Sequence, residues 1–204
     1  FEQLCSDPSD DELRKKPYPF FLCYSTDTPS EELEDVDEYV FEWKYDGIRA
    51  QLLCRDEALL WSRSGEPLNE AFPEIVRAAN HIHDEVVLDG ELLAYDAEPL
   101  PFQSLQRRLG RSNPSPKLME EVPVVFVVYD VLEHDGVDIR EDELHRRRSV
   151  LESLSLPEKM WKAEQQWFSS WDAAEEVLTD SRSYSVEGFM VKHVQSSYLS
   201  GRRK

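Results

Sequence analysis

Glycine is scarce in this sequence, and its scarcity excludes several kinds of site. Only 7 of the 204 residues are glycine, and neither Gly-x-Gly-x-x-Gly nor Gly-x-x-x-x-Gly-Lys-Ser/Thr occurs. Both motifs use glycine to bring backbone N–H groups close to a phosphate. The Gly-x-Ser-x-Gly turn that carries a nucleophilic serine is also missing. Rossmann, P-loop and α/β-hydrolase chemistry are therefore unsupported.

Positive charge is also in short supply. The chain has 23 Lys and Arg against 42 Asp and Glu, which gives a formal net charge of −19. Such a balance disfavours a generally basic surface that coats nucleic acid or binds anionic membranes. Apolar residues still make up 40% and aromatic residues 11% of the chain, which argues against wholesale disorder.

Long apolar runs and paired cysteines are missing as well. The longest apolar run, Val122 to Tyr129, is far too short for a transmembrane helix. Three cysteines without Cys-x-x-Cys spacing favour a reducing compartment over a disulfide framework. His81 and His83 are two residues apart, which makes a poor metal pair on a helix. We expect a cytoplasmic protein with no membrane contact.

Hydrophobic patterning predicts an α+β fold, with antiparallel-rich sheets flanked by helices. Residues 1–16 are predicted as a tail or linker, and 17–204 as one domain. The acidic run Glu31–Glu38 is either a solvated charge run or the start of a short helix. Strands are expected at Val40–Lys44, Ile48–Cys54, Ala58–Trp61, Val86–Tyr95, Val122–Leu132 and Val186–Val194. Helices are expected at Asn69–His83 and Phe102–Leu109, from Glu141 onwards, and from Trp171 to Leu178.

Three polar interruptions fall inside these strands. In Glu42-Trp43-Lys44-Tyr45-Asp46-Gly47, strand alternation places Glu42 and Lys44 on one side. Lys44 is then either a nucleophile on a rigid scaffold or a solvated lysine beside a turn. In Leu88-Asp89-Gly90-Glu91-Leu92, Asp89 and Glu91 share a face and are either solvated or paired with a cation or hydroxyls.

The third interruption is Val186-Glu187-Gly188-Phe189-Met190-Val191-Lys192, in which Lys192 is an isolated cation near the end of an apolar strand. Each motif is weak alone. Together, two strand lysines and two acidic strand motifs form a set able to hold a nucleoside triphosphate and Mg²⁺. Lys44 would then attack the α-phosphorus.

The order KYDGIR, SRSG, LDGEL, VYDVL and VEGFMVK resembles the covalent nucleotidyltransferases, specifically the adenylation domain of ATP-dependent DNA ligases. The resemblance runs from Pro17 to the last residue, and PYPFFL, LPFQSLQRRLGR and Gly201-Arg202-Arg203 are similar to its bacterial branch. It implies an ATP-grasp-like nucleotidyltransferase fold. Phe126, by contrast, is expected in the core.

The resemblance also implies roles for single residues. Lys44 would be the catalytic residue that forms lysyl-AMP, with Asp46 and Gly47 completing its loop. Glu42 would contact the adenine amino group, and Tyr129 would stack on the base.

The same resemblance places further residues around the ribose and phosphates. Arg49 and Arg63 would lie near the ribose and the nick phosphate, and Lys192 near the α-phosphate. Glu91 would bind ribose and, with Glu187, a Mg²⁺ or Mn²⁺ ion, and Asp89 would be a supporting residue of the site.

The resemblance implies an ATP-dependent DNA ligase, with ATP as cofactor and nicked duplex DNA as partner of a monomeric, nucleoid-associated bacterial enzyme. The family's next lysine motif and its oligonucleotide-binding-fold domain do not occur before Lys204. We therefore expect a C-terminally truncated fragment that binds ATP poorly, self-adenylates weakly or not at all, and holds DNA weakly or not at all. An RNA ligase or mRNA-capping guanylyltransferase of the same superfamily is the alternative, and a non-catalytic nucleotide-binding module is another.

The resemblance implies an enzyme that acts on DNA, although the chain as a whole is acidic. We therefore expect the positive charge to be concentrated at a few positions of the sequence. The candidates are Lys44, Arg49, Arg63, Lys192, Arg107, Arg108 and Arg111.

Overall fold

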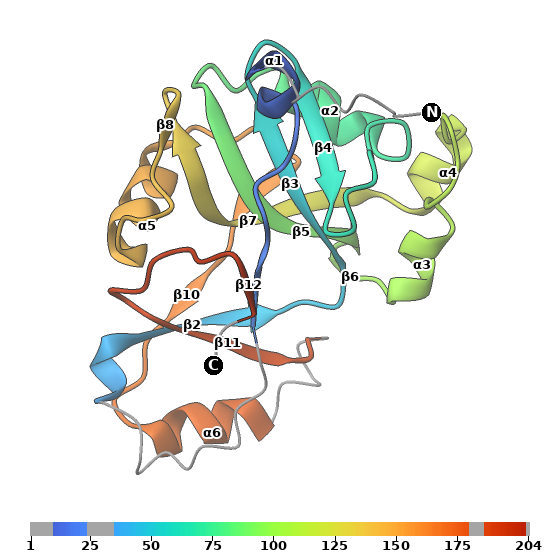
Figure 1. Cartoon of the computed structure of the whole chain (residues 1–204). Coiled ribbons are helices and arrows are strands. Elements are labelled where there is room, and N and C mark those ends of the chain that lie inside the picture. The colour runs from blue at the N-terminus through green and yellow to red at the C-terminus, as the bar shows by residue number, and fades with distance from the viewer. Residues whose placement is uncertain (1–9, 24–34, 180–185, 203–204) are drawn as a thin grey trace, which may run out of the picture.

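A computed structural model describes residues 10–23, 35–179 and 186–202 of the chain, and it is built from a large antiparallel sheet, a small sheet and surrounding helices (Figure 1). The helices are α1 (Asp10–Arg14), the 3₁₀ turn η2 (Val36–Glu38), α2 (Pro73–Ala79), α3 (Phe102–Gln106), α4 (Pro116–Glu121), α5 (Leu144–Ser153) and α6 (Trp171–Thr179). No helix in these ranges is long and apolar enough to cross a membrane.

The large sheet has the strand order β4-β3-β5-β7-β8, with neighbours antiparallel, and β6 and β9 pair at its margins. Its strands are β3 (Ile48–Cys54), β4 (Ala58–Ser62), β5 (Val86–Asp96), β6 (Glu98–Pro99), β7 (Val124–His134), β8 (Val137–Asp138) and β9 (Met160–Lys162). A two-stranded parallel pair, β1 (Phe21–Leu22) and β12 (Gly201–Arg202), joins segments from opposite ends of the chain.

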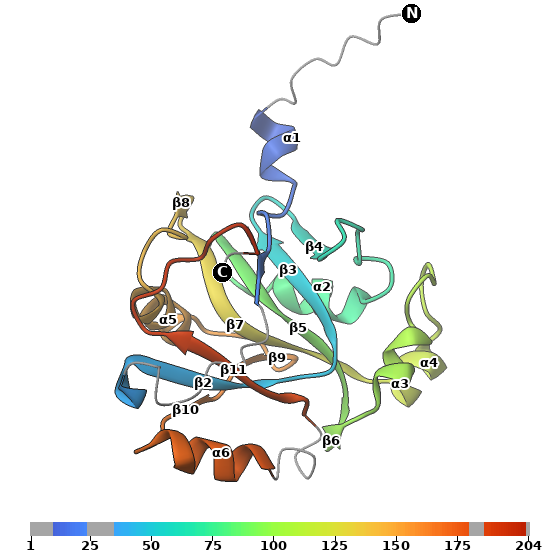
Figure 2. The ribbon, with the colours of Figure 1, turned by 60° about the horizontal axis from the view of Figure 1, so that its bottom comes forward.

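The small sheet has the order β10-β2-β11, formed by β10 (Gln165–Gln166), β2 (Tyr39–Lys44) and β11 (Gly188–His193). Along β2 the side chains alternate between the two faces. Phe41 packs with Phe168, Trp171 and Phe189 at centroid distances of 5.0 to 5.7 Å, and α6 covers this aromatic face (Figure 2). The opposite face, which carries Glu42 and Lys44, is not covered by α6 and can carry the functional side chains.

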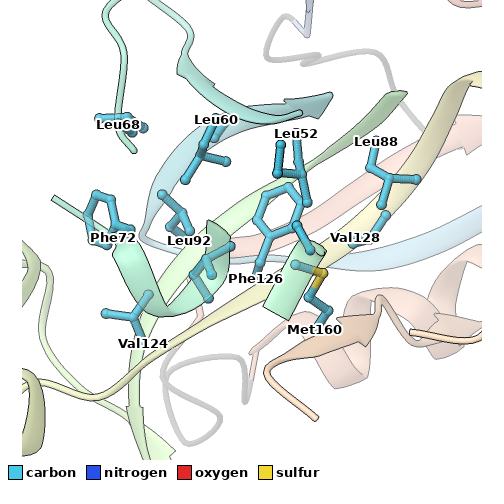
Figure 3. Close-up of a cluster of buried hydrophobic side chains, with 14 of the residues drawn as sticks. Leu52, Leu60, Leu68, Phe72, Leu88, Leu92, Val124, Phe126, Val128 and Met160 are labelled. Atoms are coloured by element: carbon cyan, nitrogen blue, oxygen red, sulfur yellow. The ribbon is translucent and has the colours of Figure 1, made fainter. Parts of the chain in front are cut away.

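The main core lies on one face of the large sheet, against α2, α3 and α5. Leu52, Leu60, Leu92 and Phe126 are completely buried there, and Figure 3 shows them directed toward one another. The expected core position of Phe126 is thus confirmed. Continuous apolar burial on β5 and β7 explains why these two strands read as nearly unbroken hydrophobic runs.

The predicted α+β fold with antiparallel-rich sheets and flanking helices is confirmed. The expected helix Asn69–His83 is shorter, because Pro73 stands at its first position and Asn80 caps its end. Helix α4 was not predicted, and residues 10–14 of the expected tail form one helical turn. The acidic run lies partly outside the described residues, and its last three residues form η2.

Arg108 corrects one sequence-based expectation. We expected it, together with Arg107 and Arg111, among the candidates for local positive charge, but its side chain is fully buried. Its guanidinium donates to both carboxylate oxygens of Glu74, at 2.8 and 2.9 Å, and to two backbone carbonyls. Arg108 is therefore a structural cross-link under α2, whereas Arg107 and Arg111 remain exposed.

Replacing Arg108 tests this cross-link. Arg108→Ala leaves the Glu74 carboxylate and two carbonyls buried without their donor, so we expect a loss of about 3–5 kcal/mol in the free energy of unfolding. Urea denaturation measures it. Arg107→Ala removes only an exposed ion pair with Glu121 and serves as the control, with no measurable change expected. Equal effects of the two substitutions would contradict the structural role.

Candidate active site

Pairing of β2 with β11 brings the first and third sequence motifs together. Gly188 lies opposite Lys44 and Met190 opposite Glu42. The Glu187 N–H donates to the Lys44 carbonyl at 2.8 Å, and the two side chains form an ion pair. Gly188 has φ +141°, a conformation that side-chain-bearing residues rarely adopt. The predicted nucleophile thus sits beside one of the two predicted metal-binding acids.

Gly47 fastens the loop after Lys44 to the large sheet. A Cβ atom at this position would lie 2.4 Å from the Leu92 carbonyl oxygen and 2.7 Å from Glu91 Cγ. Only glycine fits such a close approach. The adjacent Asp46 is exposed. The supporting role predicted for Gly47 therefore has a physical basis, because the glycine lets the Lys44 loop lie directly against β5.

The second motif supplies a buried ion pair. Arg49 donates to both oxygens of Asp89, Nη2 to Oδ2 at 2.8 Å and Nε to Oδ1 at 3.3 Å, and Asp89 is completely buried. A third donation, from Arg49 Nη1 to the Phe21 carbonyl, is 2.6 Å long. The partner of Asp89 is thus Arg49, whereas the sequence alone left a metal cation or hydroxyls open.

Tyr198 completes this network, and the sequence did not single it out. Its hydroxyl donates to Asp89 Oδ2 at 2.6 Å and accepts from Arg49 Nη2 and from the Phe21 N–H at 3.3 and 3.2 Å. Its ring packs edge-on against Phe21 at 5.9 Å. Ser-Ser-Tyr-Leu carries no pattern that distinguishes this tyrosine, so only the fold reveals its contacts.

Glu91 lies opposite Arg49 on β3 and close to the Lys44 loop. Burial raises the pKa of Glu91 to about 8, even though Arg49, Lys44 and Arg63 favour its charged form. Arg63 is exposed and follows β4, and its N–H donates to the Arg49 carbonyl at 3.2 Å. The structure therefore gathers these four predicted residues at one end of the site.

The other end of the site surrounds Glu42. Its carboxylate is 2% exposed and accepts from Lys192 Nζ at 2.6 Å and from Gln165 Nε2 at 3.4 Å. Lys192 Nζ also lies 4.8 Å from the centre of the Tyr129 ring. Burial and the nearby Asp89 charge raise the pKa of Tyr129, so this ring stays neutral.

Lys192 is separated from Lys44 along the sheet. Its backbone lies opposite Val40, four residues from Lys44, which corresponds to roughly 13 Å at the rise of a strand, while its ammonium contacts Glu42, two residues from Lys44. We expected Lys192 at the α-phosphate, but its ammonium contacts the predicted base-binding residues. The α-phosphate role of Lys192 stays a prediction, and in the structure its ammonium is paired with Glu42.

The site is thus an elongated surface with two chemically distinct ends. Glu42 and Lys192 form one end, which offers a carboxylate and an ammonium, and Tyr129 lies between the two ends, with its ring centre 4.8 Å from Lys192 Nζ and 5.8 Å from Arg49 Cζ. Lys44 and Glu187 stand at the other end, where Arg49, Arg63 and Glu91 supply positive charge and a further carboxyl. Such an arrangement suits a ligand with a flat polar base at one end and anionic groups at the other.

The Tyr198 network gives a stability prediction. Tyr198→Phe keeps the ring packing and removes the hydrogen bond to the buried Asp89 carboxylate, so we expect a loss of about 1–3 kcal/mol. Thermal and urea unfolding measure it. Tyr95→Phe removes only a hydrogen bond to the Ala97 carbonyl at an exposed position and is the control. A Tyr198→Phe variant as stable as Tyr95→Phe would show that the network does not hold the fold.

Comparison with known proteins places this geometry in a family. The sequence profile described as "ATP dependent DNA ligase domain" matches residues 20–204. A probable DNA ligase of Koribacter versatilis is 30% identical over 213 residues, covering 92% of this chain and 37% of the relative. The DNA ligase of Methanocaldococcus jannaschii is 30% identical, covering 98% and 39%. The chain thus spans well under half the length of these bacterial and archaeal relatives.

Solved structures agree on the fold. The ligase domain of M. tuberculosis LigD superimposes with a TM-score of 0.70 at 24% identity, covering 95% of this chain and 59% of that one. Chlorella virus DNA ligase-adenylate gives 0.67 at 15% identity, covering 91% and 63%. Since the family profile spans nearly the whole chain and the fold matches, this chain belongs to the ATP-dependent DNA ligase domain family.

Proposed function

We propose that this chain is the nucleotide-transferring part of an ATP-dependent DNA ligase, and that Lys44 is its nucleophile. One observation carries the proposal. A single face of β2 presents Lys44 beside the Glu187 carboxylate and, two residues away, the buried acceptor Glu42. A nucleotide laid along this face would have its base at Glu42 and its α-phosphate at Lys44.

The base would bind between Tyr129 and the small sheet. Tyr129 offers an aromatic face, and Glu42 offers an acceptor for the exocyclic amine of adenine. In the structure Lys192 lies over this ring and on this carboxylate. We propose that Lys192 moves aside to border the base, which revises the α-phosphate role that we expected for it.

In the transfer step, the neutral Lys44 amine would form a nitrogen–phosphorus bond at the α-phosphorus of ATP. The bond to the pyrophosphate oxygen breaks, pyrophosphate leaves, and the amine proton passes to solvent or a nearby base. Glu187 would orient the Lys44 nitrogen through their contact. Arg49 and Arg63 would neutralise the charge of the departing oxygens.

Glu91 and Glu187 are the residues that would hold a divalent cation. Both offer carboxylate oxygens, the ligands that Mg²⁺ and Mn²⁺ prefer, and both lie near Lys44. Burial raises the pKa of Glu91 although Arg49, Lys44 and Arg63 favour its charged form, and a bound divalent cation would favour that charged form further. A bound cation would supply charge neutralisation for the phosphate oxygens.

The later steps are proposed from the family. AMP would pass from Lys44 to a 5′-phosphate at a nick in duplex DNA, and the adjacent 3′-hydroxyl would displace it. This activity would serve DNA replication, repair or recombination in the cytoplasm, with the protein acting as a monomer. The acidic chain described here would contribute little DNA affinity by itself.

Prolonged incubation with ATP and Mg²⁺ tests the nucleophile. We expect a slow gain of one AMP by intact-mass analysis, mapped by peptide digestion to Lys44 and abolished in Lys44→Ala. Lys117→Ala, an 86% exposed lysine on α4, is the control and keeps the adduct. An adduct that persists in Lys44→Ala would refute this assignment.

The raised pKa of Glu91 predicts how stability depends on pH. Between its ordinary value of 4.5 and about 8, the folded chain keeps a proton that the unfolded chain loses. Stability contributed by this group is therefore lost as pH rises from about 5 to 8, and it levels off above that. We expect Glu91→Gln to flatten this part of the profile in urea unfolding. Glu66 is exposed, so Glu66→Gln is the matched control, and we expect it to leave the dependence of stability on pH unchanged.

A further inference from the structure

Arg148 is a buried cation beside the base-binding end that neither the motifs nor the proposed reaction uses. It lies on α5, its side chain is 11% exposed, and Nη1 stands 3.8 Å from Glu42 Oε1. Its other terminal nitrogen, Nη2, donates to the Ala163 carbonyl and to Glu152 Oε1, each at 2.6 Å. Nη2 therefore anchors the side chain, while Nη1 stands beside Glu42.

Two donors of this guanidinium are unsatisfied. Nε and Nη1 are buried and have no hydrogen-bond partner among the described residues. The 3.8 Å separation from Glu42 is an ion-pair distance, too long for a hydrogen bond. Buried N–H groups are nearly always paired. One of these unpaired donors, Nη1, stands beside Glu42 at the base-binding end, where an acceptor on a ligand would satisfy it.

Glu42 stands between two cationic donors. Lys192 contacts its Oε2 and Arg148 faces its Oε1, so the side chains present a donor, an acceptor and a donor. The exocyclic amine of adenine is likewise flanked by ring nitrogens N1 and N7, both acceptors. Guanine would place its O6 acceptor against the carboxylate and its N1–H against a cation. The three side chains thus match adenine and oppose guanine.

We infer that Arg148 is an adenine-recognition residue, whose free guanidinium N–H groups donate to the ring nitrogen beside the exocyclic amine and select ATP over GTP. This inference rests on the proposed function and deepens it. It differs from a purely structural role, in which Arg148 would only tie α5 to the Ala163 carbonyl. A structural role would weaken all nucleotides equally.

Equilibrium binding tests the inference without depending on slow adduct formation. Isothermal titration of the chain compares ATP, GTP, 1-deaza-ATP and 7-deaza-ATP in four proteins. These are the unsubstituted chain, Arg148→Met, Arg148→Lys, and Arg146→Lys as the control. Arg146 is on the same helix, but it is 67% exposed and paired with Glu143. Circular dichroism and thermal melting establish that each variant folds, and Arg148→Lys keeps a cation should Arg148→Met fail to fold.

For the unsubstituted chain we expect ATP to bind about tenfold or more tightly than GTP, and one of the two deaza analogues to bind about tenfold more weakly than ATP. In Arg148→Met we expect the preference for ATP over GTP and the preference for ATP over that deaza analogue each to fall about fivefold or more. Arg148→Lys falls between, and Arg146→Lys changes neither preference. The analogue whose penalty disappears in Arg148→Met identifies the contacted nitrogen.

Two failures are distinguishable. If ATP binds with its preferences intact in the Arg148 variants, or if ATP and GTP weaken by the same factor, the inference is wrong and the proposed function stands. If the unsubstituted chain neither binds a nucleotide at any concentration tested nor gains AMP at Lys44 on prolonged incubation, the proposed function is wrong and the inference is wrong with it.

Discussion

Burying carboxylates in the middle of antiparallel sheets is the constraint around which this domain is organised, because an unpaired buried charge is costly. Asp89 on β5 and Asp130 on β7 are each held by a two-nitrogen arginine contact, from Arg49 and from Arg147. The arginine partners come from another strand and from α5. Each ion pair therefore fixes one element against another. The same contacts that stabilise the fold also set the positions of the groups that face the ligand.

Glu42 follows the same rule with a different outcome. Its cationic neighbours, Lys192 and Arg148, come from β11 and α5, and two nitrogens of Arg148 have no hydrogen-bond partner among the described residues. The Asp89 carboxylate, by contrast, accepts hydrogen bonds on both oxygens, from Arg49, Tyr129 and Tyr198. One acid is thus structural, and the other retains the capacity to bind something further. The β2 strand makes this possible, since its aromatic face is packed on α6 and its polar face is not.

The strands and the motif residues on them could be predicted, because alternation and apolar runs are local properties of the chain. Spacing alone put Glu42 and Lys44 on one face, and β2 shows that arrangement. Long-range partners could not be predicted, since nothing near Tyr198 marks it as a donor to Asp89. The burial of Arg108 could not be predicted for the same reason, because its partner Glu74 is 34 residues away in the sequence. Arg148 gave one local signal, a charge on the apolar side of its helix.

The parallel pairing of β1 with β12 has a consequence for the order of assembly during synthesis. Phe21 pairs with Gly201. The Phe21 carbonyl accepts a hydrogen bond from Arg49, and the Phe21 N–H donates to the Tyr198 hydroxyl oxygen. Closing so long a loop comes late in folding. A nascent chain can form the large sheet from residues already outside the ribosome, but the surroundings of Arg49 are completed only after Tyr198 and Gly201 have emerged. Nucleotide binding would therefore report completion of the domain rather than collapse of its core.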